Sequence, residues 1–568
     1  MASVDNNLEE LMSHLGEFGK YQFWQFSLHI LGALTAGLHM LTLLTVAAVP
    51  PHKCNVPETD TLVADPNNLT TIYSNSTVEI LPRAVDACYY LDASNEMKEC
   101  DSWTYDTQYF QSSRGMEWNF VCSRRWMGAL AQSSYIFGVS IGAVTLGSLA
   151  DKYGRKIIFY VSAIAQLVLG VSVAFVNNYH LFLAFRFLYG IFGSAGAYIT
   201  GFVLSMELVG ATKRTVCGIM FQLTFAVGFM LVAIWGAVIK DRVWLQIVYG
   251  LHSALLVGHW WLMDESPRWL WAQGRVTEAL AIVQKGLRMN GTDVDIDAAK
   301  LIGEGKIRGR ADRRERSYGA LDLFKTPNLR KKTLNVCLNW FANSIVYYGL
   351  SLNAGNLVGN PFLMLFLSGL VEMPTYVMIC FLMDRVGRRC MITSFMLIGG
   401  VCCVTASVIP AGGSDLTRTA IVGIVLFGKS NISGSFAVIY NYTAELFPTV
   451  VRNTGLGIGS MCARLSGTLT PAIMLLDSLD PKVPAILFGF IALVSGFLSM
   501  YLPETANQPM PETIEDGENF GRDDTCFATC LGSDKKGRSA YEVKLNQLAE
   551  KDEKERLNQG ENAREYSS

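Results

Sequence analysis

Four charged side chains lie in one long, largely apolar stretch near the C-terminal end of the chain. The stretch covers residues 428–471, and its charges are Lys429, Glu445, Arg452 and Arg464. Apolar residues continue on both sides of Arg464, from 455 to 476. A charge at the centre of a bilayer costs roughly 2.5–3.5 kcal/mol on insertion scales, so it is usually kept for a function. We therefore predict two membrane helices that meet a central cavity and present charge to a solute.

The composition is typical of a membrane protein. Of 568 residues, 50% are hydrophobic and 17% are charged, whereas about 25% are charged in soluble domains. The net charge of −2 argues against nucleic acid as a partner. We find no metal-ligand cluster and no nucleophile constellation in the sequence, so we expect neither an enzyme nor a cofactor or metal site. The polar N-terminal residues do not resemble a secretory signal, so the first apolar run should remain as a helix.

A polar segment between the first two apolar runs carries four cysteines and two glycosylation sequons. The cysteines are Cys54, Cys88, Cys100 and Cys122, and the sequons begin at Asn68 and Asn75. An even set of cysteines in one polar loop indicates two disulfides, for which three pairings are possible. Together with the sequons, these cysteines predict that the loop lies outside the cell.

Apolar runs of about 20 residues predict twelve membrane spans. The spans start near Phe23, Met127, Ile157, Leu181, Thr215, Trp244, Thr333, Pro361, Met391, Thr419, Thr454 and Pro484. Loops after even-numbered spans are basic, which places both termini in the cytosol and the cysteine loop outside. The predicted regions are a cytosolic N-terminus (1–22), a first six-helix half (23–263, with the loop at 50–126), a basic cytosolic linker (264–332), a second half (333–502) and a cytosolic tail (503–568).

Three sequence features recur after equivalent spans. Asp151-Lys-Tyr-Gly-Arg-Lys in the first half corresponds to Asp384-Arg-Val-Gly-Arg-Arg in the second. The pair Glu207 and Arg214 corresponds to Glu445 and Arg452. Glu265, which precedes Ser-Pro, corresponds to Glu504, which lies between Pro and Thr. The two members of each pair lie nearly the same number of residues apart along the chain, and such a constant spacing indicates an internal repeat. The predicted fold is therefore an all-α membrane protein of two six-helix repeats that enclose a site near the midplane.

The repeated charges could do more than set topology. We predict an ion-pair network on the inner side that latches the two halves while the cavity faces outward; the alternative is that the bases only orient the spans. The residues of this network are Gly147, Asp151, Gly154, Arg155, Lys156, Glu207 and Arg214 in the first half, and Asp384, Gly387, Arg388, Glu445 and Arg452 in the second.

At these motifs the sequence resembles the major facilitator superfamily, and more narrowly solute carrier family 22, the organic cation, carnitine and organic anion transporters. The resemblance covers residues 15–515. It is carried by NWFANSIVYYGLSLNAGNLVGNPFLMLFLSGLVEMP (339–374), FLMDRVGRR (381–389), FAVIYNYTAELFPTVVRNTGLGIGSMCARLSG (436–467) and ESPRWLWAQGR (265–275).

The resemblance implies a set of cavity residues. Trp340 and Tyr347, Glu372 and Gln222 match positions that line the substrate cavity in that family. Arg464 stands where organic cation transporters carry aspartate and where carnitine and anion transporters carry arginine. Glu372 matches the cation transporters, so the resemblance implies a mixed site.

This mixture favours a zwitterion. Aromatic faces attract ammonium groups, Glu372 would pair with the same amine, and the planar fork of Arg464 suits a carboxylate. Three alternatives remain: Glu372 could pair with Arg464, or Arg464 with Glu445, for gating alone, and the aromatics could be packing residues. Lys429 is predicted near the outer mouth, either in the cavity or snorkelling.

We predict a multi-pass carrier in the plasma membrane that moves small organic cations or zwitterions by alternating access. An organic anion exchanger is the main alternative, and a sugar porter or a non-transporting receptor on the same scaffold is less favoured. The expected partners are a small organic solute and the lipid bilayer; the oligomeric state is not predicted.

Overall fold

The computed structural model describes most of the chain. The described residues are 12, 14–56, 83–84, 86–91, 96–292, 319–357, 359–410, 414–506, 508, 510–522 and 524. The sequons at Asn68 and Asn75, the basic run at 305–316 and the tail beyond 524 lie outside them.

The first half is an antiparallel series of helices. They are α2 (Lys20–Leu41), α3 (Leu43–Val46), α5 (Arg125–Tyr153), α6 (Arg155–Ser172), α7 (Tyr179–Gly190), the π-helical η3 (Ile191–Ile199), α8 (Thr200–Leu208), α9 (Arg214–Val238), α10 (Arg242–Leu251) and α11 (Ala254–Val257). Single turns η2 (Val173–Phe175), η4 (Ala211–Lys213) and η5 (Gly258–Trp260) extend or connect them.

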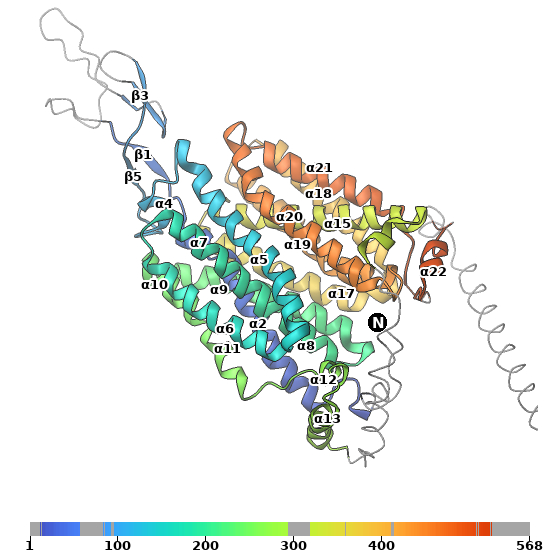
Figure 1. Ribbon diagram of the computed structural model, residues 1–568. Helices are drawn as coiled ribbons and strands as arrows, with labels where there is room; N and C mark the ends of the chain where they lie inside the picture. The colour runs from blue at the N-terminus through green and yellow to red at the C-terminus, as the bar shows by residue number, and fades with distance from the viewer. Residues whose placement is uncertain are drawn as a thin grey trace, which may run out of the picture.

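The second half repeats this order. Its helices are α15 (Pro327–Leu352), α16 (Pro361–Leu370), α17 (Glu372–Val386), α18 (Arg388–Val408), α19 (Asp415–Leu446), α20 (Arg452–Met474) and α21 (Val483–Ser499), with the short turns η7 (Ala320–Phe324), η8 (Asn353–Asn356) and η9 (Leu475–Ser478). In Figure 1 the two halves, blue to green and yellow to orange, lie against each other lengthwise.

The helices begin within a few residues of the twelve predicted starts. Polar residues accept the first backbone N–H groups of several helices, as Asn178, Asp241 and Asn360 do for α7, α10 and α16. The largest difference is α15, which begins at Pro327 and not near Thr333. Its first two turns carry Arg330, Lys331 and Lys332, and these charges keep that part out of an apolar run. Proline at the first helical position nevertheless favours a helix start.

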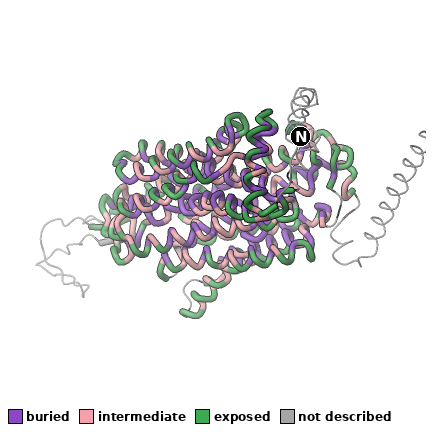
Figure 2. Tube along the Cα trace, turned by 90° about the horizontal axis from the view of Figure 1, so that it is seen from below, coloured by how far each residue is buried: buried purple, intermediate pink, exposed green. Residues whose placement is uncertain are grey.

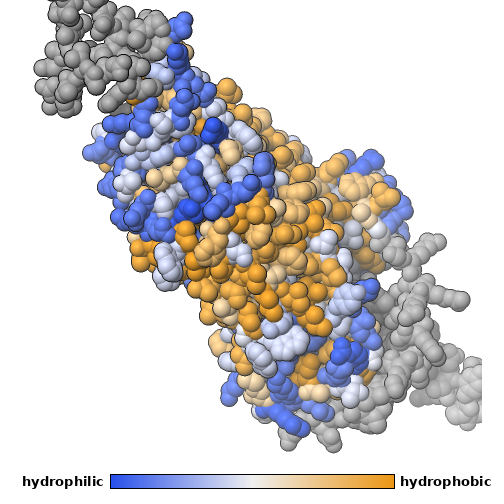
Figure 3. Space-filling model, turned by 60° about the vertical axis from the view of Figure 1, so that its left-hand side comes forward, coloured by the Kyte–Doolittle hydropathy of each residue, from blue (hydrophilic) through white to orange (hydrophobic). Residues whose placement is uncertain are grey.

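An apolar band crosses the surface of the bundle (Figure 3). Among the described residues, eight helical segments are long and apolar enough to cross a membrane. Figure 3 shows apolar side chains in a band between two polar ends, and Figure 2 shows buried residues facing the interior of the bundle. We call the end that carries residues 50–56 and 96–126 the loop end, and the end that carries Asp151 and Asp384 the motif end.

Short strands and two disulfides organise the segment at the loop end. Strand β1 (His52–Cys54) pairs with β5 (Trp103–Tyr105), and β3 (Tyr89–Leu91) pairs with β2 (Arg83–Ala84) and β4 (Met97–Glu99). Cys54 is bonded to Cys100, and Cys88 to Cys122. The second disulfide ends at η1 (Cys122–Arg124), which leads directly into α5.

A buried arginine attaches this segment to the first half. Arg114, in α4 (Arg114–Glu117), is 1% exposed. Its guanidinium pairs with Glu117 at 2.7 Å and donates to the carbonyl oxygens of Val173 and Ala174. Glu117 also pairs with Arg242 at 3.0 Å.

The two halves contact each other at the loop end. Arg125 at the start of α5 pairs with Asp477 of η9 at 2.6 Å. The Ser133 hydroxyl of α5 donates to the Thr468 carbonyl oxygen of α20 at 2.8 Å. These contacts join the first half to the second beside the predicted cavity.

Additional helices cover the motif end. They are α12 (Pro267–Ala272), α13 (Val276–Asn290) and α22 (Ile514–Asn519). The predicted linker therefore contains helices, and α13 packs against the start of α2, where the Asn290 side chain accepts from the backbone N–H of Tyr21 at 2.8 Å. The predicted tail begins with a segment that contacts the second half, since the Glu518 carboxylate accepts from the first backbone N–H groups of α15.

Helices α7 and α5 approach each other closely at Gly190 of α7 and Gly138 of α5. A Cβ on Gly190 would lie 2.1 Å from the Tyr135 carbonyl oxygen, and one on Gly138 would lie 2.2 Å from that of Phe187. Small residues allow such close approach between membrane helices.

We expect Gly190→Ala to destabilise the protein by roughly 1–3 kcal/mol, because the helices must separate to admit the methyl group. The measurement is the melting temperature of the detergent-purified protein. Gly423→Ala in α19 is the matched control, because a Cβ there meets nothing within 4 Å. Equal melting temperatures for the two variants would contradict this packing.

Candidate substrate cavity

A cavity of about 100 Å³ lies between the two halves. Both halves contribute to its wall: α2, α5, η3 and α9 from the first, and α15, α19 and α20 from the second. The lining residues are Ala36, Met40, Ile136, Val139, Ser194, Tyr198, Ile199, Gln222, Phe225, Ser344, Tyr347, Tyr348, Phe436, Tyr440, Ser460, Ala463 and Arg464.

Aromatic rings form much of this wall. The ring centroids of Tyr347 and Phe436 lie 5.8 Å apart, and those of Phe436 and Tyr440 5.9 Å apart. Tyr198 comes from the π-helical segment η3, an irregularity that is frequent at functional sites. Such a wall offers ring faces to an ammonium group.

Arg464 is the only charged residue among those that line the cavity. Its Nε donates to the Ser460 hydroxyl at 3.2 Å, and its Nη1 donates to the Val139 carbonyl oxygen at 3.4 Å. No carboxylate of a described residue lies within ion-pair distance of its guanidinium. Arg464 therefore pairs with neither Glu372 nor Glu445, which were the two gating alternatives.

The other predicted cavity residues take different positions. Gln222 lines the cavity beside Tyr198, with its Nε2 3.5 Å from the tyrosine hydroxyl. Trp340 is 1% exposed and lies behind the wall, where its ring packs 4.4 Å from that of Tyr440. Its indole N–H donates to the Thr443 hydroxyl at 3.0 Å. Trp340 thus supports Tyr440 and is not among the lining residues.

Glu372 is paired with Lys429. The two side chains are 0% and 1% exposed, and Lys429 Nζ lies 3.2 Å from Glu372 Oε1. The other carboxylate oxygen accepts from the Tyr376 hydroxyl at 2.9 Å and from the Tyr347 hydroxyl at 3.3 Å. Neither charged residue is among those that line the cavity.

The position of Lys429 differs from the prediction at the outer mouth. Its ammonium donates to the Ser368 hydroxyl at 2.5 Å and lies 4.2 Å from the ring centre of Phe229. The prediction was wrong because hydropathy gives the cost of a buried charge but does not show its partner. Here the partner, Glu372, lies far away in the sequence, on helix α17, which packs against α19.

A second buried cation escaped the sequence analysis. Arg186 of α7 is 1% exposed, and its guanidinium donates to Gln132 Oε1 at 3.0 Å and to the Thr42 hydroxyl at 3.2 Å. It also lies 4.6 Å from the ring centre of Tyr135, whose hydroxyl contacts that of Ser194 in the cavity wall. The sequence does contain a signal for Arg186, because this charged residue interrupts an apolar run as Arg464 does.

At the motif end of the first half, the repeated charges form one cluster. Arg155 pairs with Asp151 at 3.0 Å and with Glu207 at 3.2 Å. The Glu265 carboxylate accepts from the backbone N–H groups of Arg155 and Lys156, which cap the start of α6. Burial raises the pKa of Glu265, and these hydrogen bonds oppose that shift.

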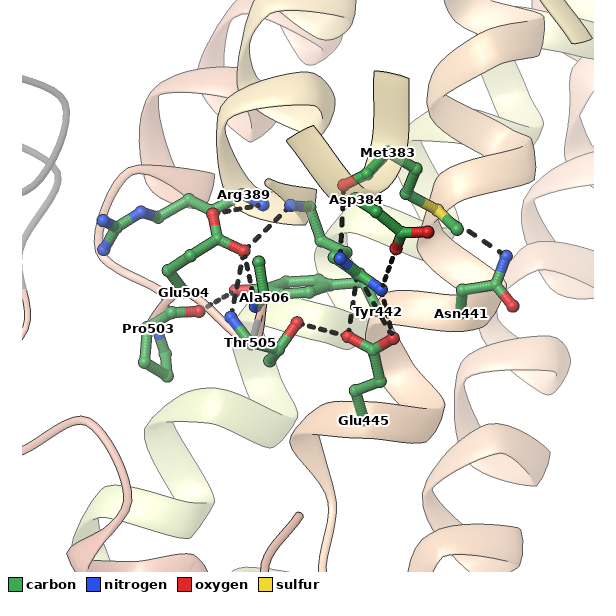
Figure 4. Close-up of polar contacts among 11 residues, drawn as sticks. Met383, Asp384, Arg389, Asn441, Tyr442, Glu445, Pro503, Glu504, Thr505 and Ala506 are labelled. Atoms are coloured by element: carbon green, nitrogen blue, oxygen red, sulfur yellow. Dashed lines mark hydrogen bonds and ion pairs between the residues drawn. The ribbon is translucent and has the colours of Figure 1, made fainter. Parts of the chain in front are cut away.

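The second half repeats this cluster (Figure 4). Arg388 pairs with Asp384 at 2.8 Å and with Glu445 at 3.0 Å. Glu504 accepts from the backbone N–H groups of Arg388 and Arg389 and so caps α18. A carboxylate at a helix N-terminus is favoured by the unpaired N–H groups and by the helix dipole.

Glycine precedes both capped helices for a geometric reason. Gly154 and Gly387 have φ of +111° and +94°, values that side chains rarely tolerate. A Cβ would also lie 2.5 Å from a Glu265 oxygen and 2.6 Å from a Glu504 oxygen. Gly147 is different, because a Cβ there would meet nothing within 4 Å.

These ion pairs join helices of the same half. The prediction was a latch between halves while the cavity faces outward; in this structure, with the loop end closed, each arginine reaches an acid on a neighbouring helix of its own repeat. The remaining motif bases lie nearby: Arg214 donates to the Val209 carbonyl oxygen at 3.3 Å, Arg452 contacts Met510 Sδ at 3.5 Å, and Lys156 Nζ lies 4.9 Å from the Trp260 ring centre. The clusters therefore hold the helices of each half together at the motif end.

Comparison with known proteins agrees with this architecture. Residues 72–516 match the family described as "Sugar (and other) transporter". The chain is 37% identical over 534 residues to the organic cation transporter protein of Drosophila melanogaster, covering 90% of this chain and 95% of that protein. It is 30% identical over 533 residues to the human organic cation/carnitine transporter 2, covering 89% and 93%.

A solved structure shares the fold. The xylose transporter XylE from E. coli, in an inward open conformation, superposes with a TM-score of 0.57 at 14% identity, covering 88% of this chain and 99% of that one. At that identity the likeness concerns the fold alone. The chain therefore belongs to the sugar (and other) transporter family of the major facilitator superfamily and, with its curated relatives, to solute carrier family 22.

Proposed function

We propose that the protein carries small zwitterions, such as betaines, carnitine-like compounds or amino-acid-derived amines, across the plasma membrane by alternating access. Membership of the family makes it a membrane transporter and not an enzyme. The names of its relatives, an organic cation transporter and an organic cation/carnitine transporter, support an amine-containing solute.

The observation that carries the proposal is the state of Arg464. Its guanidinium lines the cavity between the halves and has no carboxylate partner among the described residues, although a charge among apolar membrane helices is costly. A carboxylate on the solute would provide the missing charge. The planar guanidinium can bind it with two parallel hydrogen bonds.

The other end of the solute meets aromatic rings. Tyr198, Tyr348 and Tyr440 surround the same space, and ring faces stabilise an ammonium by roughly 0.5–2 kcal/mol. Glu372 is engaged by Lys429 and does not line the cavity, so a simple cation would face Arg464 without an opposing acid. This charge balance favours a zwitterion over a simple cation.

Organic anion exchange is the second candidate, because Arg464 alone would also accept a carboxylate without an amine. A sugar has no negative charge that could pair with the guanidinium of Arg464. A non-transporting receptor is less favoured, because both charge clusters at the motif end are complete.

We propose that the loop end faces outside, that both termini are cytosolic and that Asn68 and Asn75 carry glycans. The disulfides at the loop end suit an oxidising compartment. Bases gather at the motif end, including Lys152, Lys213 and Arg385, as the positive-inside rule requires of a cytosolic face.

Alternating access then requires the contacts at the loop end to break. The Arg125–Asp477 ion pair and the Ser133–Thr468 hydrogen bond close the outer side. The clusters around Arg155 and Arg388 keep each half rigid while one half rocks against the other.

Arg464→Asp should reduce carnitine uptake roughly 10–100-fold, because a charge-assisted hydrogen bond contributes about 1.5–3 kcal/mol. Uptake of tetraethylammonium should rise, since the cavity charge is reversed. The measurement compares labelled carnitine, β-alanine, tetraethylammonium and an aromatic carboxylate in cells with matched surface expression. Arg464→Lys, which keeps the charge and loses the fork, should lie between wild type and Arg464→Asp.

Two results would redirect the assignment. If wild type takes up the aromatic carboxylate in preference to both zwitterions, organic anion transport is the function. If wild type takes up only tetraethylammonium, and Arg464→Asp does nothing but abolish surface expression, Arg464 is structural and the zwitterion proposal falls.

Arg388→Ala should slow transport several-fold without altering substrate preference, because it separates α18 from α19 at the motif end. Arg385→Ala is the control, since Arg385 is exposed in the same turn. Initial uptake rates, normalised to surface protein, test this. Unchanged uptake in Arg388→Ala at normal surface level would show that the cluster has no part in transport.

A further inference from the structure

We propose that Lys429 is a specificity-determining residue, which neutralises Glu372 and thereby keeps simple organic cations out of the cavity. This inference rests on the proposed function and concerns the same site. It assigns a role to a residue that lies behind the cavity wall.

The ion pair is fully buried where four helices of both halves meet. Lys429 comes from α19 and Glu372 from the start of α17. The Lys429 ammonium also contacts Ser368 of α16 and the ring of Phe229 of α9, which belongs to the first half. Each charge therefore has a partner at hydrogen-bonding distance and little access to water.

Tyr347 connects the pair to the cavity. Its ring lines the cavity, its hydroxyl donates to Glu372 Oε2 at 3.3 Å, and its ring centre lies 5.6 Å from Lys429 Nζ. A single side chain thus separates the pair from the solute. In a medium of low dielectric constant, a net charge that is one side chain away acts strongly on an ion bound in the cavity.

The pair is nearly neutral when both members are present. If Lys429 lost its charge, Glu372 would be an unopposed acid beside the rings of Tyr347 and Tyr376, which is a suitable environment for a quaternary ammonium. If Glu372 lost its charge, Lys429 would add a second cation to that of Arg464. The two changes should move substrate preference in opposite directions.

Lys429→Met is the first test variant. We expect its ratio of tetraethylammonium to carnitine uptake to rise roughly tenfold or more above that of wild type. Lys429→Arg keeps the charge and should retain the wild-type ratio. The double variant Lys429→Met/Glu372→Gln removes both charges and should return the ratio toward wild type, because the gain depends on the unopposed acid.

A purely structural role predicts a different pattern. The pair also holds α17 against α19, so Lys429→Met would lower expression and uptake of both solutes equally, leaving their ratio unchanged. An unchanged ratio in Lys429→Met, or an increase that persists in the double variant, would overturn the proposal.

A second variant covers the case in which Lys429→Met does not reach the membrane. Glu372→Gln keeps hydrogen-bonding groups and frees the Lys429 charge, so uptake of an aromatic carboxylate relative to carnitine should rise roughly tenfold. If a well-expressed Glu372→Gln variant shows no rise in this uptake ratio, the neutralising role of the ion pair is refuted.

Binding separates this inference from the proposed function. Tetraethylammonium should raise the melting temperature of purified Lys429→Met and leave that of wild type unchanged, whether wild type transports zwitterions or organic anions. If wild type fails to take up zwitterions but this gain of binding occurs, the proposed substrate is wrong and the role of Lys429 stands. Equal stabilisation of both proteins by tetraethylammonium would refute it.

Discussion

The cost of placing charge inside a membrane constrains this structure more than any other interaction. Arg186, Glu372, Lys429 and Arg464 all lie within apolar helices, and each meets the constraint in its own way. Glu372 and Lys429 neutralise each other at 3.2 Å. Arg186 spreads its charge over Gln132, Thr42 and a tyrosine ring. Among the described residues, the hydrogen-bond acceptors of Arg464 are a hydroxyl and a carbonyl oxygen. Arg464 is the cation that lines the cavity, and a solute there can complete its charge balance.

At the ends of the bundle, the proposed alternating access requires the helices of each half to stay together while the halves move. At the motif end the internal repeat gives the same solution twice, an arginine held by two acids and a glutamate that caps the following helix. These interactions stay within a half. At the loop end, Arg125 and Asp477 join different halves, and this side-chain pair is partly exposed. Exposed pairs contribute about 1 kcal/mol or less, so the bond between halves is weak enough to open.

Much of the fold could be predicted because its physical causes are local. Apolar length gave helix starts within a few residues, and glycine with an acid and bases marked both tight turns. The cavity was predicted less completely. Arg464, Tyr347 and Gln222 do line it, whereas Trp340 lies behind Tyr440. Tyr198, Tyr348 and Phe436 were missed, since an aromatic residue in an apolar helix has the same sequence signature whether it faces a neighbouring helix or a solute. Arg186 was missed although the rule that found Arg464 applies to it.

The sequence by itself determined where the long apolar helices begin, the twofold repeat and the positions at which charge lies among apolar residues, because these depend on local hydropathy and on short motifs. Only the tertiary structure decided which charges meet. Glu372 and Lys429 are 57 residues apart along the chain but in contact in space, and that contact removes the acid from the cavity. Selectivity depends on such pairings, because a charge attracts a solute only to the extent that the surrounding helices leave it uncompensated.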